Sequence, residues 1–137
     1  MGLGMTQAKL EELLKIDNES YNLLRVLHMF MNLDNTQEVP LQSMAVFWYV
    51  ATYQNCSKKD IENHFKMSKA SASRMTDYIS RHHRLGKAGL GLISKERDPK
   101  DKRRTLLKLT RKGKDLIEKS FSTLYEDVKD FDQVDFE

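Results

Sequence analysis

Two closely spaced serines, Ser57 and Ser68, constrain the fold of this chain more than any other feature. The Ser57 hydroxyl can accept a hydrogen bond from the backbone three residues on, where Asp60 suits the positive end of a helix. The short helix that starts there leaves only a tight turn, at residues 66–67, before Ser68 caps a second helix that we take to about Arg81. Two helices joined this closely predict a helix-turn-helix.

The second of these helices has two dissimilar faces. Its inner face is apolar and carries Ala72, Met75 and Ile79. Its outer face is expected to be free and carries Ser71, Arg74, Tyr78 and Arg81. A helix that enters a DNA major groove needs this arrangement, because short residues let its backbone approach and arginines reach base acceptors or phosphates.

A basic hairpin is predicted to follow. Three glycines within residues 84–91 break the helix and mark a loop. Residues 92–97 and 103–109 are candidate strands, and Asp98-Pro99-Lys100-Asp101-Lys102 supplies turn residues between them. Lys100, Lys102, Arg103 and Arg104 give this hairpin a cationic tip, suited to a phosphate backbone or a narrow minor groove.

The charge of the chain is concentrated in its middle. Residues 66–114 contain 16 Lys and Arg but 4 Asp and Glu, a net charge of +12, whereas the whole chain carries +3. The flanking segments therefore carry a net charge of −9. This polarity favours a polyanionic partner. A solvated charged surface is the alternative, and the coincidence of the charge with helix-turn-helix and hairpin signals argues against it.

Helices are predicted on both sides of this region. Residues 6–33 carry two apolar stripes, one for the core and one for a partner subunit, and Asp17-Asn18 leaves open whether they form one helix or two. Pro40 favours the start of an apolar helix that contains Trp48, a core residue. Thr110 caps a last helix with a coiled-coil seam. We expect this seam to contact a second subunit, with packing on the chain's own first helix as the alternative. The dimerisation candidates are Leu10, Leu13, Leu14, Ile117, Phe121, Leu124, Val128 and Phe131.

Several classes of protein are excluded. A chain of 137 residues is too short for a barrel or two-domain enzyme, and it contains no glycine-rich phosphate loop, metal triad or recognisably paired nucleophile. We therefore expect no enzyme activity and no cofactor. No apolar run approaches the roughly 20 residues that span a bilayer, and residues 1–5 do not resemble a signal peptide. The expected location is the cytoplasm, with no membrane partner.

The cysteine and histidine content predicts neither a disulfide nor a metal site. Cys56 is the single cysteine, and the four histidines show no close zinc-ligand spacing. Redox sensing by Cys56, near a helix N-terminus, remains an alternative to a structural role. A metal site formed by His82 and His83 with His64 or Cys56 also remains an alternative, although adjacent histidines on a helix point in different directions.

At the residue level the sequence resembles the MarR family, the multiple-antibiotic-resistance regulators. Ser68-Lys69-Ala70-Ser71-Ala72-Ser73-Arg74-Met75 is similar to the start of the family's recognition helix. Asp98-Pro99-Lys100-Asp101-Lys102-Arg103-Arg104, followed by Leu109-Thr110-Arg111-Lys112-Gly113, resembles the family's wing and its exit into the next helix. The wing motif is the more specific of the two, because a helix-turn-helix pattern alone matches many unrelated helix pairs.

The resemblance implies a mostly α-helical fold with a small β-hairpin wing: a single winged helix-turn-helix domain flanked by N- and C-terminal dimerisation helices. The implied parts are a dimerisation and core helix at 6–35, a winged core at 36–109 with its wing at 92–109, and a dimerisation helix at 110–137. It also implies a homodimer with two recognition helices in successive major grooves. Each wing would place Arg103 in a minor groove, with Asp101 holding that arginine.

The sequence departs from the family pattern at three places before the wing. Residues 83–90 are an insertion before the wing, which either extends the DNA contact through Arg84 and Lys87 or is a plain loop. Glu62 stands where the family usually has a small alanine, and Lys66 where its turn often has glycine.

The function predicted from the sequence is a sequence-specific DNA-binding transcription regulator, expected to be a repressor, that binds a near-palindromic duplex as a homodimer. A small-molecule effector of unknown identity is a possible partner. The alternatives are a nonspecific winged-helix nucleic-acid accessory protein and a protein-docking module that does not bind DNA. The DNA-binding candidates are Ser68, Lys69, Ser71, Ser73, Arg74, Arg81, Arg97, Lys100, Asp101, Lys102, Arg103 and Arg104.

Overall fold

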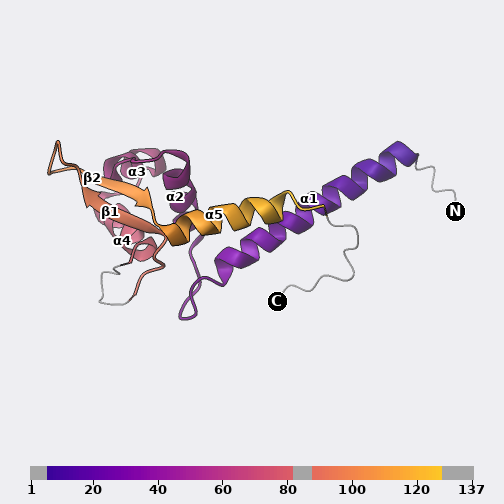
Figure 1. Ribbon diagram of the computed structural model, residues 1–137, viewed down its shortest axis with the longest axis horizontal. Coiled ribbons are helices and arrows are strands. Elements are labelled where there is room, and N and C mark those ends of the chain that lie inside the picture. Colours follow the sequence, from indigo (N-terminus) through magenta and orange to yellow (C-terminus); the bar gives the residue numbers. More distant parts are fainter. Residues whose placement is uncertain (1–5, 82–87, 128–137) are drawn as a thin grey trace.

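The chain forms a long helical arm joined to a winged head, as a computed structural model that describes residues 6–81 and 88–127 shows (Figure 1). The arm consists of α1 (Gln7–Met31) and α5 (Arg111–Leu124), which pack along each other. The head consists of α2 (Leu41–Thr52), α3 (Lys58–Phe65), α4 (Lys69–Ile79), β1 (Ile93–Arg97) and β2 (Thr105–Leu109). This is the mostly helical fold with a two-stranded wing that the sequence predicted.

Side-chain caps explain where four of the five helices begin. Thr6, Ser57, Ser68 and Thr110 each accept a hydrogen bond at 3.1 Å from a backbone N–H three residues on. At α3 the predicted capping box is complete, because Asp60 Oδ2 also accepts from the Ser57 backbone N–H at 2.8 Å. Each cap satisfies a donor that the first turn of a helix otherwise leaves unpaired.

Two helix boundaries answer questions that the sequence left open. The first helix is continuous from Gln7 to Met31, so Asp17-Asn18 does not start a new helix. Helix α4 ends at Ile79, two residues before the predicted Arg81. It ends there because Ser80 adopts an extended conformation and forms a parallel β-bridge with Ile93.

The core lies between α2, the helix-turn-helix and the wing, and α1 closes one side of it. Its fully buried side chains include Phe30, Phe47, Ile61, Ile79, Leu92, Ile93 and Leu107. Burial of each large apolar side chain contributes about 2 kcal/mol. Trp48 is confirmed as a packing residue: its ring lies 5.8 Å from Phe47 within α2 and 5.6 Å from Phe121 of α5. The aromatic contacts therefore join the head to the arm.

The wing is held at its base by the rest of the head. Strands β1 and β2 are antiparallel and pair Ile93 with Leu109 and Arg97 with Thr105. The predicted strands began one or two residues earlier, at 92 and 103. The Leu107 backbone N–H donates to the Cys56 carbonyl oxygen at 2.8 Å, and Ser57 forms a β-bridge with Leu106. The wing therefore has a fixed orientation relative to the start of α3.

The segment that returns to the wing is bonded to the end of α4. The backbone N–H groups of residues 89, 90, 91 and 92 donate to the carbonyl oxygens of residues 81, 78, 80 and 79 at 3.1, 2.9, 3.0 and 2.8 Å respectively. A Cβ at position 89 would overlap the Ser80 carbonyl group, so this close approach requires Gly89. Of the insertion at 83–90, residues up to 87, including Arg84 and Lys87, lie outside the described residues.

The joint between wing and arm explains the Leu-Thr-x-x-Gly motif. The Thr110 hydroxyl donates to the Gly91 carbonyl oxygen at 2.6 Å, and its backbone N–H donates to the Leu92 carbonyl oxygen at 3.1 Å. In the next turn, a Cβ at Gly113 would overlap the Leu92 carbonyl oxygen. Only glycine lets α5 start this close to Leu92, the residue that precedes β1.

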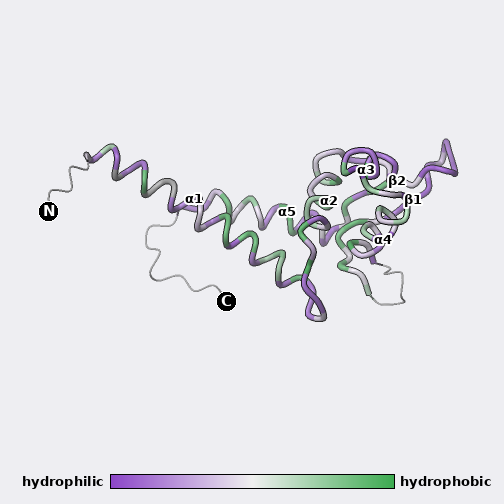
Figure 2. Tube along the Cα trace, turned by 180° about the vertical axis from the view of Figure 1, so that it is seen from behind, coloured by the Kyte–Doolittle hydropathy of each residue, from purple (hydrophilic) through white to green (hydrophobic). Residues whose placement is uncertain are grey.

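The arm leaves much of its apolar surface uncovered. Asn22 of α1 donates from Nδ2 to the Leu124 carbonyl oxygen at 3.1 Å, which ties α1 to the end of α5. Ile117 and Leu124 pack against the core, but Phe121 is 45% exposed. Leu13, Leu24 and Met31 form an exposed stripe on α1. Figure 2 shows hydrophobic stretches along the arm and a hydrophilic wing and α3. The side chains of Leu10 and Leu14, and residues Val128 and Phe131, lie outside the described part of the chain.

Candidate nucleic-acid interface

The first half of α4 presents short hydroxyl residues and cations to solvent. Ser68 caps the helix, and its hydroxyl is hydrogen bonded to the Ser71 hydroxyl at 3.0 Å. Arg74 is exposed one turn later and donates from Nη2 to Ser71 Oγ at 3.3 Å. Lys69 is exposed on the first turn. These four residues form one continuous polar surface, as the sequence predicted.

Three other residues of this region are placed differently. Ser73 is half-buried and accepts a hydrogen bond from Lys58 Nζ at 2.7 Å, so it faces α3. Arg81 is exposed but lies beyond the end of the helix. The prediction that Tyr78 lies on the free outer face is wrong: it is only 7% exposed, and its hydroxyl donates to Asp34 Oδ2 at 2.7 Å. Tyr78 packs toward the loop that follows α1.

The carboxylate that receives Tyr78 is strongly stabilised in its ionised form. The Thr36 hydroxyl and the Thr36 backbone N–H donate to Asp34 Oδ1 at 2.7 and 2.9 Å. These bonds, followed by that of Tyr78, lower the pKa of Asp34 to about 2. A hydrogen-bonded loop therefore connects the end of α1 with the recognition helix.

The wing tip is a cationic turn with internal supports. Asp98 Oδ1 accepts from the Lys100 backbone N–H at 2.9 Å, and Arg97 Nη1 donates to the Lys102 carbonyl oxygen at 2.6 Å. Asp101 Oδ1 accepts from the Arg103 backbone N–H at 3.1 Å and lies 3.5 Å from Arg103 Nε. This is the pairing expected for a wing arginine held by an aspartate. The Arg103 side chain is nevertheless 95% exposed, so it can still reach a ligand.

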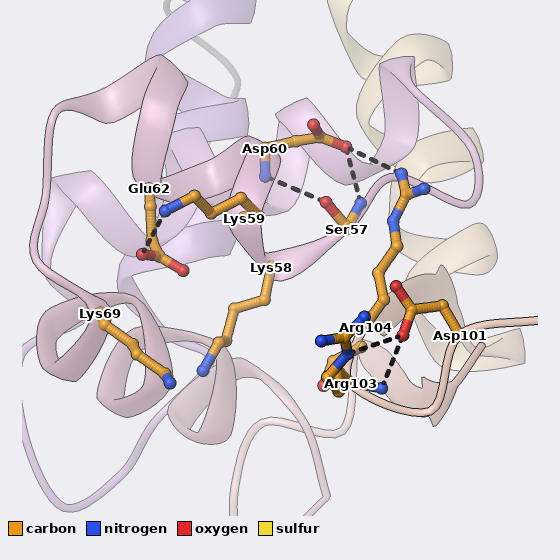
Figure 3. A pocket seen from close by; sticks show the side chains of 10 residues that line it. Ser57, Lys58, Lys59, Asp60, Glu62, Lys69, Asp101, Arg103 and Arg104 are labelled. Carbon is orange, nitrogen blue, oxygen red and sulfur yellow. Dashed lines mark hydrogen bonds and ion pairs between the residues drawn. The ribbon is translucent and has the colours of Figure 1, made fainter.

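One groove brings the recognition helix and the wing together. Its volume is about 440 Å³, and it is lined by Ser57, Lys58, Lys59, Asp60, Glu62, Lys69, Asp101, Arg103, Arg104 and Thr105. We call it the cationic groove, because five of these side chains are cationic and three are acidic. Figure 3 shows Lys69 of α4 on one side and Arg103 and Arg104 of the wing on the other. Residues that the sequence assigned separately to helix and wing therefore share one surface.

The sequence reasoning missed two residues of this groove, Lys58 and Lys59. Both lie between the capping residues Ser57 and Asp60, and two consecutive lysines in a first helical turn are an unusual feature near a positive helix end. Lys59 lies 3.8 Å from Glu62, the residue that replaces the family's small alanine. Arg104 Nη2 lies 3.9 Å from Asp60 Oδ2, so this arginine is also anchored to α3.

A second groove borders the opposite side of α4. It has a volume of about 250 Å³ and is lined by Gln37, Pro40, Gln42, Ser71, Arg74, Met75 and Tyr78. The exposed start of α4 therefore projects between two depressions, the cationic groove toward the wing and this one toward the start of α2. A helix that projects from between two hollows can enter a groove of a duplex while the flanking surfaces approach its backbone.

A third groove is apolar and lies between the head and the arm. Its volume is about 360 Å³, and its lining is Leu23, Val26, Leu27, Phe30, Leu41, Met44, Ala45, Trp48, Ser120, Phe121 and Leu124. The one hydroxyl in this lining, that of Ser120, already donates to the Leu116 carbonyl oxygen at 2.7 Å. The groove can therefore accept an apolar group but offers few polar contacts.

The remaining reactive groups show no sign of a catalytic or metal centre within residues 6–81 and 88–127. Cys56 is buried, and burial, with a smaller effect of Asp60, raises the pKa of its thiol to about 11, opposite to what a reactive thiolate needs. No group of three His, Cys, Asp or Glu side chains in the described residues could hold a metal ion. His82 and His83 fall outside them. Among the described helices, none has the length and apolar character needed to cross a membrane.

Comparisons with known proteins find likeness in structure but not in sequence. No protein-family model and no curated protein sequence matches the chain. Among solved structures, MarR aligns with a TM-score of 0.55 at 19% identity, over 83% of this chain and 74% of that one. Reduced AbfR bound to DNA aligns with a TM-score of 0.53 at 18% identity, over 86% and 80%.

A third solved structure, PcaV from Streptomyces coelicolor in complex with its natural ligand, aligns with a TM-score of 0.50 at 18% identity, over 89% of this chain and 79% of that one. The alignments span both the head and the arm, since each covers more than four fifths of the chain. The chain therefore has the winged helix-turn-helix fold of the MarR-family transcription regulators.

Proposed function

We propose that this protein is a sequence-specific DNA-binding transcription regulator that acts as a homodimeric repressor. In this proposal α4 enters the major groove of a near-palindromic site, and the wing places Arg103 in the adjacent minor groove. The observation that carries it is the cationic groove, in which Lys69 of α4 meets Arg103 and Arg104 of the wing. The two elements present cations toward the same space. This arrangement suits a DNA duplex, because a duplex offers base edges in its grooves and a phosphate backbone on either side of them.

The division of labour between helix and wing follows from the residues at each. The start of α4 offers hydroxyls and one arginine that can hydrogen bond to base edges, so it would supply sequence preference. The wing offers cations to the cationic groove, so it would supply affinity and a minor-groove contact. AbfR, a protein of similar fold, has been solved bound to DNA, which supports a duplex as the ligand.

A second copy of the chain would complete the arm. The exposed stripe of Leu13, Leu24 and Met31 lies on one side of α1, and Tyr125 follows α5 with 78% of its surface exposed. Apolar stripes on long helices are buried in coiled-coil or bundle contacts. Dimerisation through this stripe would place two heads at a fixed separation, as two half-sites of a near-palindromic operator require.

The apolar groove between head and arm would accept an effector with an apolar body. It touches α1, α2 and α5, so an occupant would contact both parts of the molecule at once. PcaV, again of similar fold, has been solved with its natural ligand. Differential binding of a ligand to two arrangements of head and arm would couple effector concentration to DNA affinity.

Selection of bound duplexes from a random pool, with the purified full chain, tests the proposed function. The expected result is a two-half-site motif with half-sites about one helical turn apart, whose affinity falls steeply with salt. Arg74→Ala should relax the preference at one base position at a cost of about 1 to 3 kcal/mol, whereas Lys119→Ala, on α5 outside the cationic groove, should not change it. Binding without any preferred sequence would favour a nonspecific accessory protein. Failure to bind duplex at low salt would favour a protein-docking module.

A further inference from the structure

We propose that Lys58, in the cationic groove, is a seat for one phosphodiester of the DNA backbone, with Lys69 beside it binding the same group. This inference rests on the proposed function and adds to it a residue on α3, outside both the recognition helix and the wing. Lys58 comes from the first turn of α3, and its ammonium extends toward α4 (Figure 3). The group that Lys58 would bind is a phosphate oxyanion, which a DNA backbone and free inorganic phosphate both carry.

The position of the ammonium is fixed before any ligand arrives. Lys58 Nζ donates to Ser73 Oγ on α4 at 2.7 Å, and the side chain is half-buried. Among the described residues, Ser73 is the one that accepts a hydrogen bond from the Lys58 ammonium. Two of the three N–H donors of this ammonium therefore remain for an incoming oxygen. A lysine held in this way loses less side-chain freedom on binding than a freely moving surface lysine.

The surroundings of Lys58 leave its charge poorly compensated. The Asp77 carboxylate is bonded to Lys95 Nζ at 2.6 Å, and the Glu62 carboxylate lies 3.8 Å from Lys59 Nζ. Burial, then the positive charge of Lys95 and that of Lys69, lower the pKa of Lys58, and Glu62 and Asp77 only partly oppose this. A half-buried cation among other cations is a costly arrangement that a bound anion would relieve.

The shape of the groove and the identity of its rim favour a backbone phosphate. The groove borders α4 on its wing side, where the backbone of a duplex would pass if the helix start lay in the major groove. Lys69 lies exposed beside Lys58, so two lysines from two helices face the same space, while Arg103 stands exposed on the opposite side, where it can enter a minor groove. Arg104, by contrast, is directed at Asp60 and forms part of the wall. Two lysine ammonium groups that face one space suit a phosphodiester oxygen.

Lys58→Gln tests the seat, because it keeps most of the side chain and removes the charge. Binding to the selected site and to random duplex should weaken by the same factor, about 10-fold, and the slope of log affinity against log salt should fall by about one unit. Lys119→Gln, which removes a lysine from α5, is the matched control and should change neither quantity. Thermal unfolding of each variant checks that the fold is retained.

A second variant separates positioning from charge. Ser73→Ala keeps every cation but frees the Lys58 ammonium, so affinity should fall about 3-fold while the salt slope stays unchanged. Unchanged affinity in Lys58→Gln would overturn the proposal, as would a loss confined to the selected sequence, which would make Lys58 a base-reading residue.

A parallel titration with inorganic phosphate at constant ionic strength distinguishes the two sources of the oxyanion. Saturable phosphate binding that Lys58→Gln abolishes, with duplex affinity intact, would assign the site to the free ion and overturn the proposal. The wild-type protein separates this proposal from the function on which it rests. Binding without sequence preference would refute the regulator function, while a uniform loss in Lys58→Gln would still support the seat. No duplex binding at low salt would refute both.

Discussion

The head and the arm of this molecule expose side chains of opposite character. The exposed side chains of the cationic groove and the wing are charged, and several are already held: Arg103 by Asp101, Arg104 by Asp60 and Lys59 by Glu62. The exposed side chains of the arm include large apolar groups without such support, among them Leu24 and Met31. The head therefore exposes a surface that suits a charged ligand, and the arm exposes an apolar surface whose contact with water is unfavourable.

This difference indicates what each part needs to be complete. The geometry of the head is fixed by bonds within the chain, such as that from the Leu107 N–H to the Cys56 carbonyl oxygen at 2.8 Å. We therefore expect one copy of the chain to keep the cationic groove that we propose binds DNA. In the proposed homodimer, the arm would bury its exposed apolar side chains against a second copy. The following predictions test this contrast.

The largest expected effect is at Gly113, where head and arm join. Gly113→Ala places a Cβ against the Leu92 carbonyl oxygen and should destabilise the fold by about 3 kcal/mol, because neither backbone can move freely. Urea unfolding measures the change, and Ser122→Ala, an exposed change in the same helix, should stay within about 0.5 kcal/mol. Equal unfolding midpoints for Gly113→Ala and the wild type would show that the joint is loose and that head and arm are less coupled than their contacts indicate.

The next effect concerns the arm alone. Leu24→Glu combined with Met31→Glu should weaken self-association by at least about 2 kcal/mol, roughly a 30-fold rise in the dimer dissociation constant, because both charges enter the apolar stripe. Sedimentation at several protein concentrations measures it. Glu19→Lys changes charge on another side of α1 and should leave the dissociation constant unchanged. If the double variant dimerises like the wild type, the stripe is not the interface.

A smaller effect is expected in the turn of the helix-turn-helix. Lys66 has φ +52° and ψ +45°, a left-handed conformation in which glycine is unstrained, so Lys66→Gly should stabilise the protein by about 0.5 to 1 kcal/mol. Asn55→Gly, at φ +62°, should give a smaller gain because asparagine tolerates this region better than lysine does. Urea midpoints compare the two. A loss of stability in Lys66→Gly would mean that the lysine side chain supports the head in a way that its backbone does not reveal.

The smallest effect is expected from oxidation or alkylation of Cys56. Burial raises the pKa of this thiol from 9.0 to about 11, so the folded protein should react slowly with iodoacetamide at pH 8 and keep its DNA affinity after mild peroxide treatment. The folded state holds the thiol proton more tightly than the unfolded state. This contribution to stability is therefore complete below pH 9 and is lost as the pH rises toward 11. Mass spectrometry compares labelling of folded and urea-unfolded protein, and equal rates would contradict the expectation.

Local signals made much of the fold predictable. The caps at Ser57, Ser68 and Thr110 depend on residues within one helical turn, and each forms as expected. The turn residues of the wing are also local, and Asp101 pairs with Arg103 as the family resemblance implied. These features could be predicted because the chemistry that creates them is encoded in neighbouring positions.

Features that depend on distant segments were missed. Helical spacing placed Tyr78 on the outer face of α4, but the loop at Asp34 covers that side. The end of α4 at Ile79 depends on a β-bridge to Ile93, so the local sequence pattern could not predict it. The cationic groove is formed by three elements, so the local pattern could not predict the place of Lys58 in it either. The sequence also shows two apolar stripes on the first helix without showing which one the core takes. The structure buries Val26 and Phe30 of one stripe and leaves Leu13, Leu24 and Met31 of the other exposed.

The four backbone bonds that tie residues 89–92 to the end of α4 have a consequence for how such a protein can change over evolution. They fix where the chain leaves α4 and where it enters the wing, because the Gly89 N–H donates to the Arg81 carbonyl oxygen at 3.1 Å. The number of residues between these two anchor points is thereby uncoupled from the angle at which the wing leaves the helix. Lineages could lengthen, shorten or recompose that stretch, and engineers could insert a reporter there, while the spacing of the cations that we propose bind DNA is inherited intact.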